Sequence, residues 1–563
     1  MDSYQSGSSS SYLGSVSRMV SDSVSYVQND LFKSGLKSTI SGTSKQATNE
    51  ATRVVAINDN SGFIKKAVAI SLVSAAAFGS AFYIGYQLAK RRHRFHVREA
   101  DKNDQIEHIL GKFKLSKEYL NKVMELMLEE MHKGLDPVTH DKADIKMFPT
   151  YVRSLPDGTE KGDILALDLG GTNFRVLLIN LDSGDIKVKS KVFLIPQSIM
   201  TGSGIQLFDH IAKCVAGFMN AEKLIQNNKE YPLGFTFSFP CHQKGLASAI
   251  LATWTKGFDC SGVVGNDVVE MLQEAIDRRG DIRVKVLALV NDTVGTLMAS
   301  AYNDQNTKIG LILGTGSNAC YVENLDNVKT WDGDRNDPKQ VIINMEWGAF
   351  GDNGCINFLR TEYDTEVDKT SLNPSKQIYE KMMSGMYMGE IVRLIILDLW
   401  EKELLFVGHR DHSWSTDYRQ ALYTKGSFYT KYVSEIETDS GVTYRHTKSV
   451  LEQMGLDRPT YDDCVIVQYV CKLVSRRAAQ LAAAGLAVLL NHINAPNVTI
   501  AVDGSLYRFH PKFKKNMEKA MQMLVLPHIR YKIILSTDAS GKGASLVAAV
   551  EYKKTKSCYQ VHH

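Results

Sequence analysis

Two glycine-rich bends, each lying between two apolar strand-like segments, restrict this chain to a small set of folds. The first pair of strands is predicted over residues 163–181, with the sequence DLGGTN at residues 168–173 forming the bend. The second pair follows about 145 residues later, over residues 308–325, with GTGSN at residues 314–318. Repetition of one strand–turn–strand unit indicates a duplicated architecture, in which two lobes of the same topology surround a cleft.

The composition of the two bends suits phosphate binding. Backbone N–H groups of a glycine-rich turn can approach phosphate oxygens that a larger side chain would keep away. Glycine is also common in ordinary hairpins, so one such bend would be weak evidence, and two in related settings are better evidence. Asp168 ends the first strand and is placed to hold Mg²⁺ through water, because Mg²⁺ keeps several waters and takes few carboxylates.

A second group of residues has the side chains that a polyhydroxylated ligand requires. Each buried hydroxyl group both donates and accepts, so a sugar site mixes carboxylates, amides and hydroxyls. Asp292 stands out, because the pair Asn291-Asp292 directly follows the apolar run 286–290 and α/β folds place ligands at the carboxyl ends of strands. Taken singly, most of the others are more often structural or solvent-exposed residues. The group consists of Ser238, Thr255, Lys256, Asn291, Asp292 and Glu346.

The N-terminal part contains a segment that is long and apolar enough to cross a membrane. Tyrosines are the only ionisable residues between positions 67 and 89, and a helix of about 23 residues spans the hydrocarbon core. Two lysines precede this segment, and the larger basic cluster KRRHR follows at residues 90–94, which predicts a cytosolic location for the rest of the chain. A core helix and a cleaved signal peptide are the alternatives. The flanking charges disfavour the first, and the distance from the N-terminus disfavours the second.

Three other segments have a recognisable pattern. Residues 1–60 are rich in Ser, Thr, Asn and Gly, which predicts a disordered tail; a membrane-surface helix within it would lack a strong basic face. The apolar spacing over residues 104–131 predicts helical structure. The apolar stretch 478–490 is too short to span a membrane and predicts a buried helix.

Composition excludes some classes of function. The chain has 563 residues, which suits two or more domains, and 44% of them are hydrophobic, as in folded soluble proteins. A net charge of +4 gives no reason to expect nucleic-acid binding. The eight cysteines form neither a CxxC pair nor a zinc-type spacing, so they fit a reducing compartment.

Seven motifs, in the same order along the chain, resemble those of eukaryotic hexokinases and glucokinases. They occupy residues 167–175, 233–240, 254–258, 290–293, 314–321, 373–390 and 502–507. The similarity extends from about Lys112 to Tyr552, and one such unit is present, as in the single-unit members of the family. The resemblance implies an α/β, two-lobed, actin-like ATPase (ribonuclease H-like) hexokinase fold, preceded by the disordered tail and one transmembrane helix.

The resemblance also implies a division of the chain. We expect an N-terminal tail over residues 1–63, a transmembrane helix with basic flanks over 64–94, and a helical lead-in packed on the large lobe over 95–150. The small lobe is expected over 151–290, the large lobe over 291–537, and a C-terminal helix that returns to the small lobe, followed by a tail, over 538–563.

The family's chemistry is the phosphorylation of D-glucose and similar hexoses at the 6-hydroxyl, with ATP and Mg²⁺. The resemblance implies that Asp292 is the general base and that Lys256 orients the sugar. It assigns the sugar hydroxyls to Ser238, Thr255, Lys256, Asn291, Asp292, Asn318, Glu346, Gln377 and Glu380. It places Asp168, Gly170, Gly171, Thr172, Asn173, Arg175, Thr315 and Gly316 beside the phosphates, and Thr430, Ser434, Gly504, Ser505 and Ser540 around the nucleotide.

Two departures from the family pattern concern the nucleotide site. Thr537 stands where relatives usually have an acidic residue, and Ala539 where they have Gly, so a positive φ at Ala539 would weaken nucleotide binding. A sugar sensor with little catalysis is therefore the alternative function, and a structural or chaperone ATPase of the actin-like fold is a third. The outer mitochondrial membrane is the expected location, the endoplasmic reticulum also fits, and the oligomeric state is left open.

Overall fold

The computed structural model describes residues 101–170, 173–182, 185–225, 229–254, 258–407, 416–456, 458–536 and 539–561. The chain divides into two compact units, residues 1–103 and 104–563, and both large β-sheets belong to the second. The predicted tail and the predicted transmembrane segment at 67–89 lie outside the described residues.

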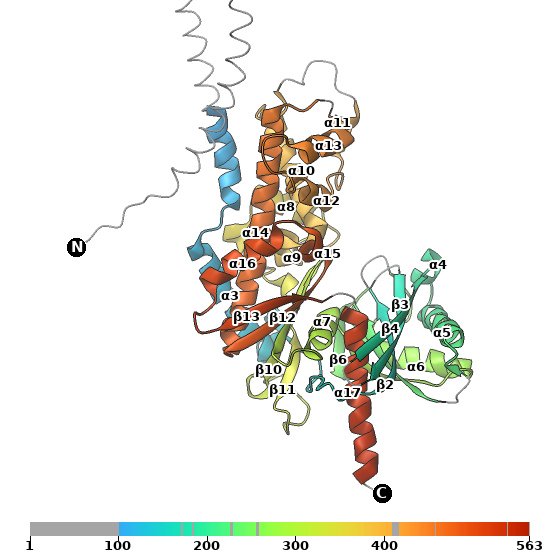
Figure 1. Ribbon diagram of the computed structural model, residues 1–563. Coiled ribbons are helices and arrows are strands. Elements are labelled where there is room, and N and C mark those ends of the chain that lie inside the picture. The colour runs from blue at the N-terminus through green and yellow to red at the C-terminus, as the bar shows by residue number, and fades with distance from the viewer. Residues whose placement is uncertain are drawn as a thin grey trace, which may run out of the picture. The chain divides into compact units, whose positions relative to one another are not determined.

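Two β-sheets with the same strand order form the framework of the second unit (Figure 1). The strands of the first are β2 (Gly162–Leu169), β3 (Asn173–Asp182), β4 (Asp185–Leu194), β5 (Tyr231–Phe237) and β8 (Val284–Val290). Those of the second are β1 (Phe148–Pro149), β9 (Thr307–Leu313), β10 (Ser317–Asn324), β11 (Gln340–Asn344), β12 (Asn497–Asp503) and β13 (Arg530–Leu535). A separate hairpin pairs β6 (Cys241–Gly245) with β7 (Ser248–Leu251).

The strand order confirms the predicted duplication. The orders are β4-β3-β2-β5-β8 and β11-β10-β9-β12-β13, and β1 extends the second sheet beside β11. In each sheet three consecutive strands form an antiparallel meander, and two later strands add in parallel beside the first of the three. Both glycine-rich bends therefore occupy the same place, between the first and second strands of a meander.

The α-helices of the described residues cover both faces of the sheets. Besides the helical residues 101–110, they are α3 (Lys117–Leu135), α4 (Gln197–Met200), α5 (Gly204–Ala221), α6 (Val268–Arg279), α7 (Asp292–Ala301), α8 (Glu362–Lys369), α9 (Ile378–Met383) and α10 (Gly385–Glu401). They continue with α11 (Thr416–Tyr423), α12 (Thr430–Ile436), α13 (Arg445–Gln453), α14 (Tyr461–Ile493), α15 (Ser505–Phe509), α16 (Phe513–Leu524) and α17 (Ala539–Val561).

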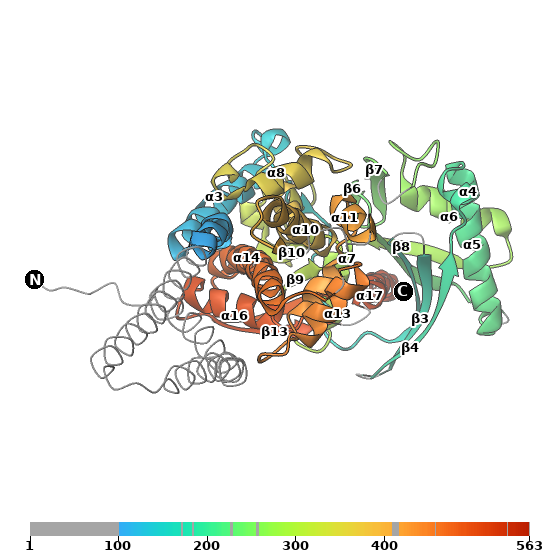
Figure 2. The ribbon, with the colours of Figure 1, turned by 90° about the horizontal axis from the view of Figure 1, so that it is seen from above.

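The alternation of side chains along β2 explains how the five-stranded sheet is covered. Leu165 and Leu167 belong to the core formed with α5 and α6, whereas Ile164 and Ala166 pack with Leu546 of α17. Successive side chains of a strand point to opposite faces, so one run of apolar residues serves both layers. Figure 2 shows α5 and α6 side by side, on the opposite side of these strands from α17.

The six-stranded sheet is covered by α7 on one face and by a larger group of helices, including α3 and α14, on the other. Helix α14 is the one helix of the described residues that is long and apolar enough to cross a membrane, and 94% of its most apolar stretch is buried inside the protein. The predicted buried helix at residues 478–490 is confirmed as part of α14, which is a core helix here.

The predicted helical pattern over residues 104–131 is interrupted. Residues 104–110 are helical and a 3₁₀ turn follows at Gly111–Phe113, but α3 begins only at Lys117. The cause is Ser116, whose side chain accepts a hydrogen bond from the N–H of Tyr119 and so caps a new helix. Apolar periodicity continues across this break, because both helical segments pack on the same core.

Helices α7 and α17 cross between the two sheets at contacts that only glycine permits. A Cβ atom at Gly543 would lie 1.9 Å from the carbonyl oxygen of Gly295, and one at Gly234 of β5 would lie 2.0 Å from the carbonyl oxygen of Ala544. The atoms that each Cβ would meet belong to the backbone, so they cannot move aside as the end of a flexible side chain could. The first residues of α7 and α17 are thereby held at the junction of the two sheets.

We predict that Gly543→Ala destabilises the protein by about 1–3 kcal/mol, the usual cost of overpacking a core. The matched control is Gly217→Ala on α5, where a Cβ would meet nothing within 4 Å and alanine should stabilise the helix by about 0.5–1 kcal/mol. Chemical denaturation of the full-length chain measures both changes. Equal effects of the two substitutions would contradict the tight crossing.

Candidate functional site

A cavity of about 390 Å³ is lined by residues of the five-stranded sheet and of the six-stranded sheet's loops. Three of the predicted sugar contacts, Asn291, Glu346 and Gln377, lie in its wall. Apolar side chains complete much of the wall, namely Phe148, Phe237, Phe239, Pro240 and Leu289. An apolar cavity with a few convergent polar groups is typical of a small-molecule site.

The start of α7 carries Asn291 and Asp292. Asn291 is the N-cap, and its Oδ1 atom accepts hydrogen bonds from the backbone N–H and the hydroxyl of Thr293, at 2.9 and 2.8 Å. Asp292 is the half-buried first residue of the helix, and its Oδ1 also accepts from the N–H of Thr293 at 2.9 Å. The positive end of the helix dipole stabilises a negative charge at this position.

Amide and carboxylate groups from β10, β11 and the following loop form one hydrogen-bonded cluster. The Asn318 amide donates to Asn344 Oδ1 (2.8 Å) and Glu346 Oε1 (3.1 Å), and Asn344 donates to the same Glu346 oxygen at 2.8 Å. Asn318 and Glu346 were predicted as sugar contacts. Asn344 was not, although it stands two residues before Glu346 and lines the cavity.

Two predicted sugar contacts have a left-handed backbone, with φ of 58° at Glu346 and 59° at Gln377. This conformation is unfavourable for residues other than glycine, and such strain persists where the surroundings enforce it, often at functional sites. The absence of a side chain at Gly348 leaves room for the Gln377 amide, because a Cβ at position 348 would lie 2.1 Å from Gln377 Oε1. The left-handed positions therefore direct Glu346 and Gln377 from separate loops toward one wall.

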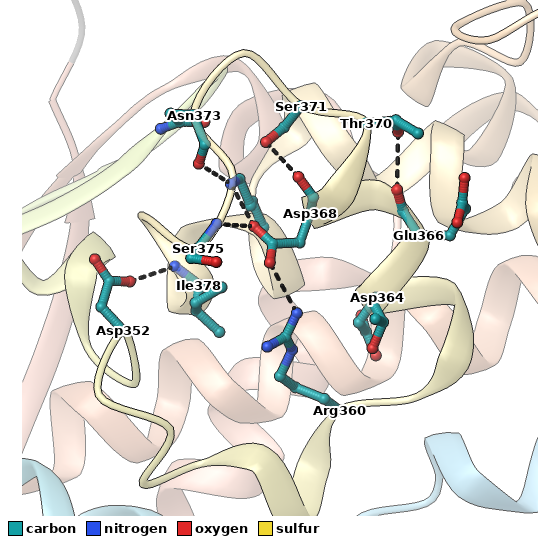
Figure 3. A network of polar contacts seen from close by, with 12 residues as sticks. Asp352, Arg360, Asp364, Glu366, Asp368, Thr370, Ser371, Asn373, Ser375 and Ile378 are labelled. Atoms are coloured by element: carbon teal, nitrogen blue, oxygen red, sulfur yellow. Dashed lines mark hydrogen bonds and ion pairs between the residues drawn. The ribbon is translucent and has the colours of Figure 1, made fainter.

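A polar network around Asp368 holds the loop that leads into α9 (Figure 3). Its Oδ1 accepts from the ammonium group of Lys381 and from the backbone N–H of Ser375, at 2.8 and 2.9 Å, and its Oδ2 accepts from Arg360 at 3.0 Å. Lys381 is only 3% exposed and also donates to the carbonyl of Asn373 at 2.7 Å. A buried lysine paired in this way fixes the loop, since losing one partner would leave the other charge unpaired.

The first glycine-rich bend is joined to the start of α17. Asp168 Oδ2 accepts hydrogen bonds from Arg175 on β3 at 2.7 Å and from the Ser540 hydroxyl at 2.8 Å. Next to Asp168, a Cβ at Gly170 would meet only Ser238 Oγ, at 3.9 Å. The structure thus brings together Asp168, Gly170, Arg175 and Ser540 of the predicted phosphate and nucleotide set, with Ser238 of the predicted sugar set beside them.

The second glycine-rich bend lies against the end of β12. A Cβ at Gly504, which has φ of 121°, would be 2.2 Å from the carbonyl oxygen of Leu313, so glycine is required there. Ser505 is close to Gly314 of the same bend, and Glu380 Oε2 accepts the N–H of Ser317 at 2.8 Å. A Cβ at Gly316 would lie 2.6 Å from that oxygen, so Glu380, predicted as a sugar contact, lies beside this bend.

The remaining predicted nucleotide residues have local partners. The Thr430 hydroxyl donates to Gly385 O at 2.6 Å and accepts the N–H of Gly389, so it ties α12 to α10. Ser434 Oγ bonds the Thr430 carbonyl at 3.5 Å, and Thr315 is exposed on the second bend. Ala539 is the buried first residue of α17 and has helical structure. Gly171, Thr172, Thr255, Lys256, Thr537 and the side chain of Asn173 lie outside the described residues.

The part of the chain that the structure describes shows neither a cluster of metal-ligating side chains nor a disulfide. It contains no group of three or more His, Cys, Asp or Glu residues that would hold a metal ion. Its seven cysteines are free thiols. Any ion near Asp168 would therefore depend on water and on ligand oxygens for most of its coordination.

Comparison with known proteins identifies the family. Two family models described as hexokinase match residues 105–302 and 308–550. Human Hexokinase-2 and human Hexokinase-1 are each 48% identical, over 80% of this chain and 49% of their own length. The solved structure of a hexokinase from Schistosoma mansoni complexed with glucose is 43% identical, covers 80% of this chain and 99% of that chain, and has a TM-score of 0.72. The chain belongs to the hexokinase family.

The hexokinase matches divide the chain where the duplicated topology does. One family model contains the first glycine-rich bend and the whole five-stranded sheet, and the other contains the second bend. The chain spans about half the length of the curated hexokinases it matches. The residues before 105 are covered by neither hexokinase model.

Proposed function

We propose that this chain transfers the γ-phosphoryl group of ATP to the 6-hydroxyl of D-glucose and related hexoses. The observation that carries the proposal is a cavity whose wall brings Asn291, Glu346 and Gln377 together at the start of α7, where Asp292 lies. The solved relative that is 43% identical contains glucose, which supports a hexose as the ligand. A weakly catalytic sugar sensor of the same fold is the alternative.

In the proposed reaction Asp292 takes the proton of the 6-hydroxyl while the hydroxyl oxygen bonds to the γ-phosphorus and the bond to the β–γ bridging oxygen breaks. A positioned carboxylate base contributes roughly 10²–10⁴-fold. Lys256 orients the sugar and offsets developing charge, and Asn318, Glu346, Gln377, Glu380, Ser238, Thr255 and Asn291 hold the hydroxyls. The remaining task is in-line positioning, because phosphoryl transfer asks little covalent chemistry of the protein.

We propose that the two glycine-rich bends bind the phosphates of ATP from opposite sheets. Gly170 has open space beside it, and Asp168 is held by Arg175 and Ser540 in a position that suits contact with Mg²⁺ through water. When bound, Mg²⁺ neutralises charge on the transferred phosphoryl group. Gly504 and Ser505 beside the second bend, with Thr430 and Ser434 on α12, complete the proposed nucleotide site.

The two sheet units are proposed to act as lobes, residues 151–290 and 291–537, with the helix from residue 538 packed on the first. Closure around the sugar would exclude water, which is a smaller competing nucleophile.

Residues 67–89 are proposed to anchor this enzyme to the outer mitochondrial membrane, with the catalytic part in the cytosol.

We predict that Asp292→Ala lowers glucose-6-phosphate formation by a hundredfold or more, the scale of a lost general base. Asp326→Asn, which changes an exposed carboxylate in the 3₁₀ helix Leu325–Asn327, is the control and should retain full activity. The assay uses the full-length chain in mild detergent with MgATP. A wild-type chain that binds glucose without turnover would favour the sugar sensor.

We predict that Asn344→Ala raises the KM for glucose about tenfold or more, because Glu346 loses a charge-assisted hydrogen bond that orients its carboxylate. Asn324→Ala, at the exposed end of β10, is the matched control. An unchanged KM in Asn344→Ala would remove this residue from the sugar site.

We predict that the full-length chain stays in the membrane pellet after alkaline carbonate extraction, whereas a chain lacking residues 1–94 is released. Retention of the shortened chain would place the anchor elsewhere. Fractionation of cells then identifies the membrane.

A further inference from the structure

The turn at residues 351–354 and the start of α9 are joined by Asp352. Its Oδ1 atom accepts a hydrogen bond from the backbone N–H of Ile378 at 3.1 Å, and its side chain is only 8% exposed. Figure 3 shows Asp352 reaching this N–H from a separate segment of the chain. Ile378 directly follows Gln377, the left-handed residue in the cavity wall, so this bond fixes the backbone on the C-terminal side of Gln377.

The same turn is held from its other side by Asp144, which lies before β1. Its Oδ2 atom accepts from the backbone N–H groups of Gly351 and Asn353, both at 3.0 Å. The backbone N–H of Asp144 in turn donates to Glu130 Oε2 on α3 at 2.9 Å. The carboxylates of Glu130, Asp144 and Asp352, together with this turn, therefore link α3 to the first residue of α9.

We propose that Asp352 is a positioning residue for the hexose site, whose negative charge holds Gln377 in place through the N-terminus of α9. The inference deepens the proposed function and rests on it. Gln377 needs such support on both sides, since its left-handed backbone is not its preferred conformation. The Asp368 network fixes the loop before Gln377, and Asp352 fixes the residue after it.

The surroundings of Asp352 make its charge sensitive to pH. Burial is the largest influence on its pKa and, with the negative charge of Asp144, raises it to about 6. The hydrogen bonds from the backbone N–H groups of Ile378 and Gln377, and the charge of Lys376, whose Nζ is 4.0 Å from Oδ2, lower the pKa and so limit the rise. Burial also raises the pKa of Asp144, and Glu130 adds to that shift.

The sign of the pH effect follows from these shifts. At pH 7–8 Asp352 is ionised and makes charge-assisted hydrogen bonds to the start of α9, which are stronger than neutral ones. As the pH falls through about 6 the carboxylate takes up a proton, and the support for Gln377 weakens. Hexose affinity should therefore decrease on the acid side of pH 6.

The test is the dissociation constant of glucose for the full-length chain, measured by calorimetry between pH 5 and pH 8 without ATP. Leaving out ATP avoids the titration of its own phosphate groups. The wild type should bind more weakly below a midpoint near pH 6. Asp352→Asn should bind about three- to tenfold more weakly at pH 7.5, the difference between a charge-assisted and a neutral bond, and should lose the midpoint.

Substitutions of the neighbouring charges move the midpoint in opposite directions while Asp352 stays in place. Asp144→Asn removes a negative charge and should lower the midpoint, whereas Lys376→Gln removes a positive charge and should raise it. Asp326→Asn, in the exposed 3₁₀ helix Leu325–Asn327, should leave it unchanged, because Asp326 is not among the groups that shift the pKa of Asp352. Midpoints that do not move, or a titration that persists in Asp352→Asn, would overturn the proposal.

Thermal unfolding distinguishes a positioning role for Asp352 from a structural one. Asp352→Asn removes a buried charge, so its thermal unfolding temperature at pH 8 should equal or exceed that of the wild type while its affinity falls. A large loss of stability with the same loss of affinity would indicate a merely structural role and overturn the proposal.

A wild type that does not bind glucose at all refutes the proposed function, whereas glucose binding with no pH midpoint refutes this inference alone.

Discussion

The close crossing of α7 and α17 at glycine residues is the constraint on which the arrangement of this protein depends. Gly295, Gly543 and Gly234 let two helices and β5 approach until backbone atoms touch. One helix packs on each sheet, so their crossing sets how the two sheets meet. Asp292 is the first residue of α7, and Ser540, which binds Asp168, is in the first turn of α17. The position of the proposed base and that of the first bend thus follow from the same contact.

The two halves share a topology but use it for different chemistry. In the first half, the bend begins with Asp168, whose partners come from β3 and α17. In the second half, the bend receives Glu380 and packs against Gly504 instead. A duplicated scaffold supplies two equivalent turns with backbone N–H groups, and the side chains added around each turn decide what it binds.

The sugar end of the cavity depends on backbone conformations that are unfavourable by themselves. Glu346 and Gln377 both have positive φ, and each is tied into a polar network at its own or the next backbone N–H. Buried carboxylates at Asp352 and Asp368 provide much of this support. Burial disfavours the ionised form of both, but Lys381 and Arg360 hold the pKa of Asp368 below its usual value, whereas the pKa of Asp352 is raised.

The sequence by itself determined the local features: two strand–turn–strand units, the buried helix at residues 478–490, the Asn291-Asp292 pair at the end of β8, and the family. These depend on patterns within a few residues, on side-chain alternation and on motif composition. Only the tertiary structure decided the contacts of Asn344 and Asp352 and the normal helical conformation of Ala539. Those features arise from burial and from contacts between segments far apart in the chain, which no local pattern encodes.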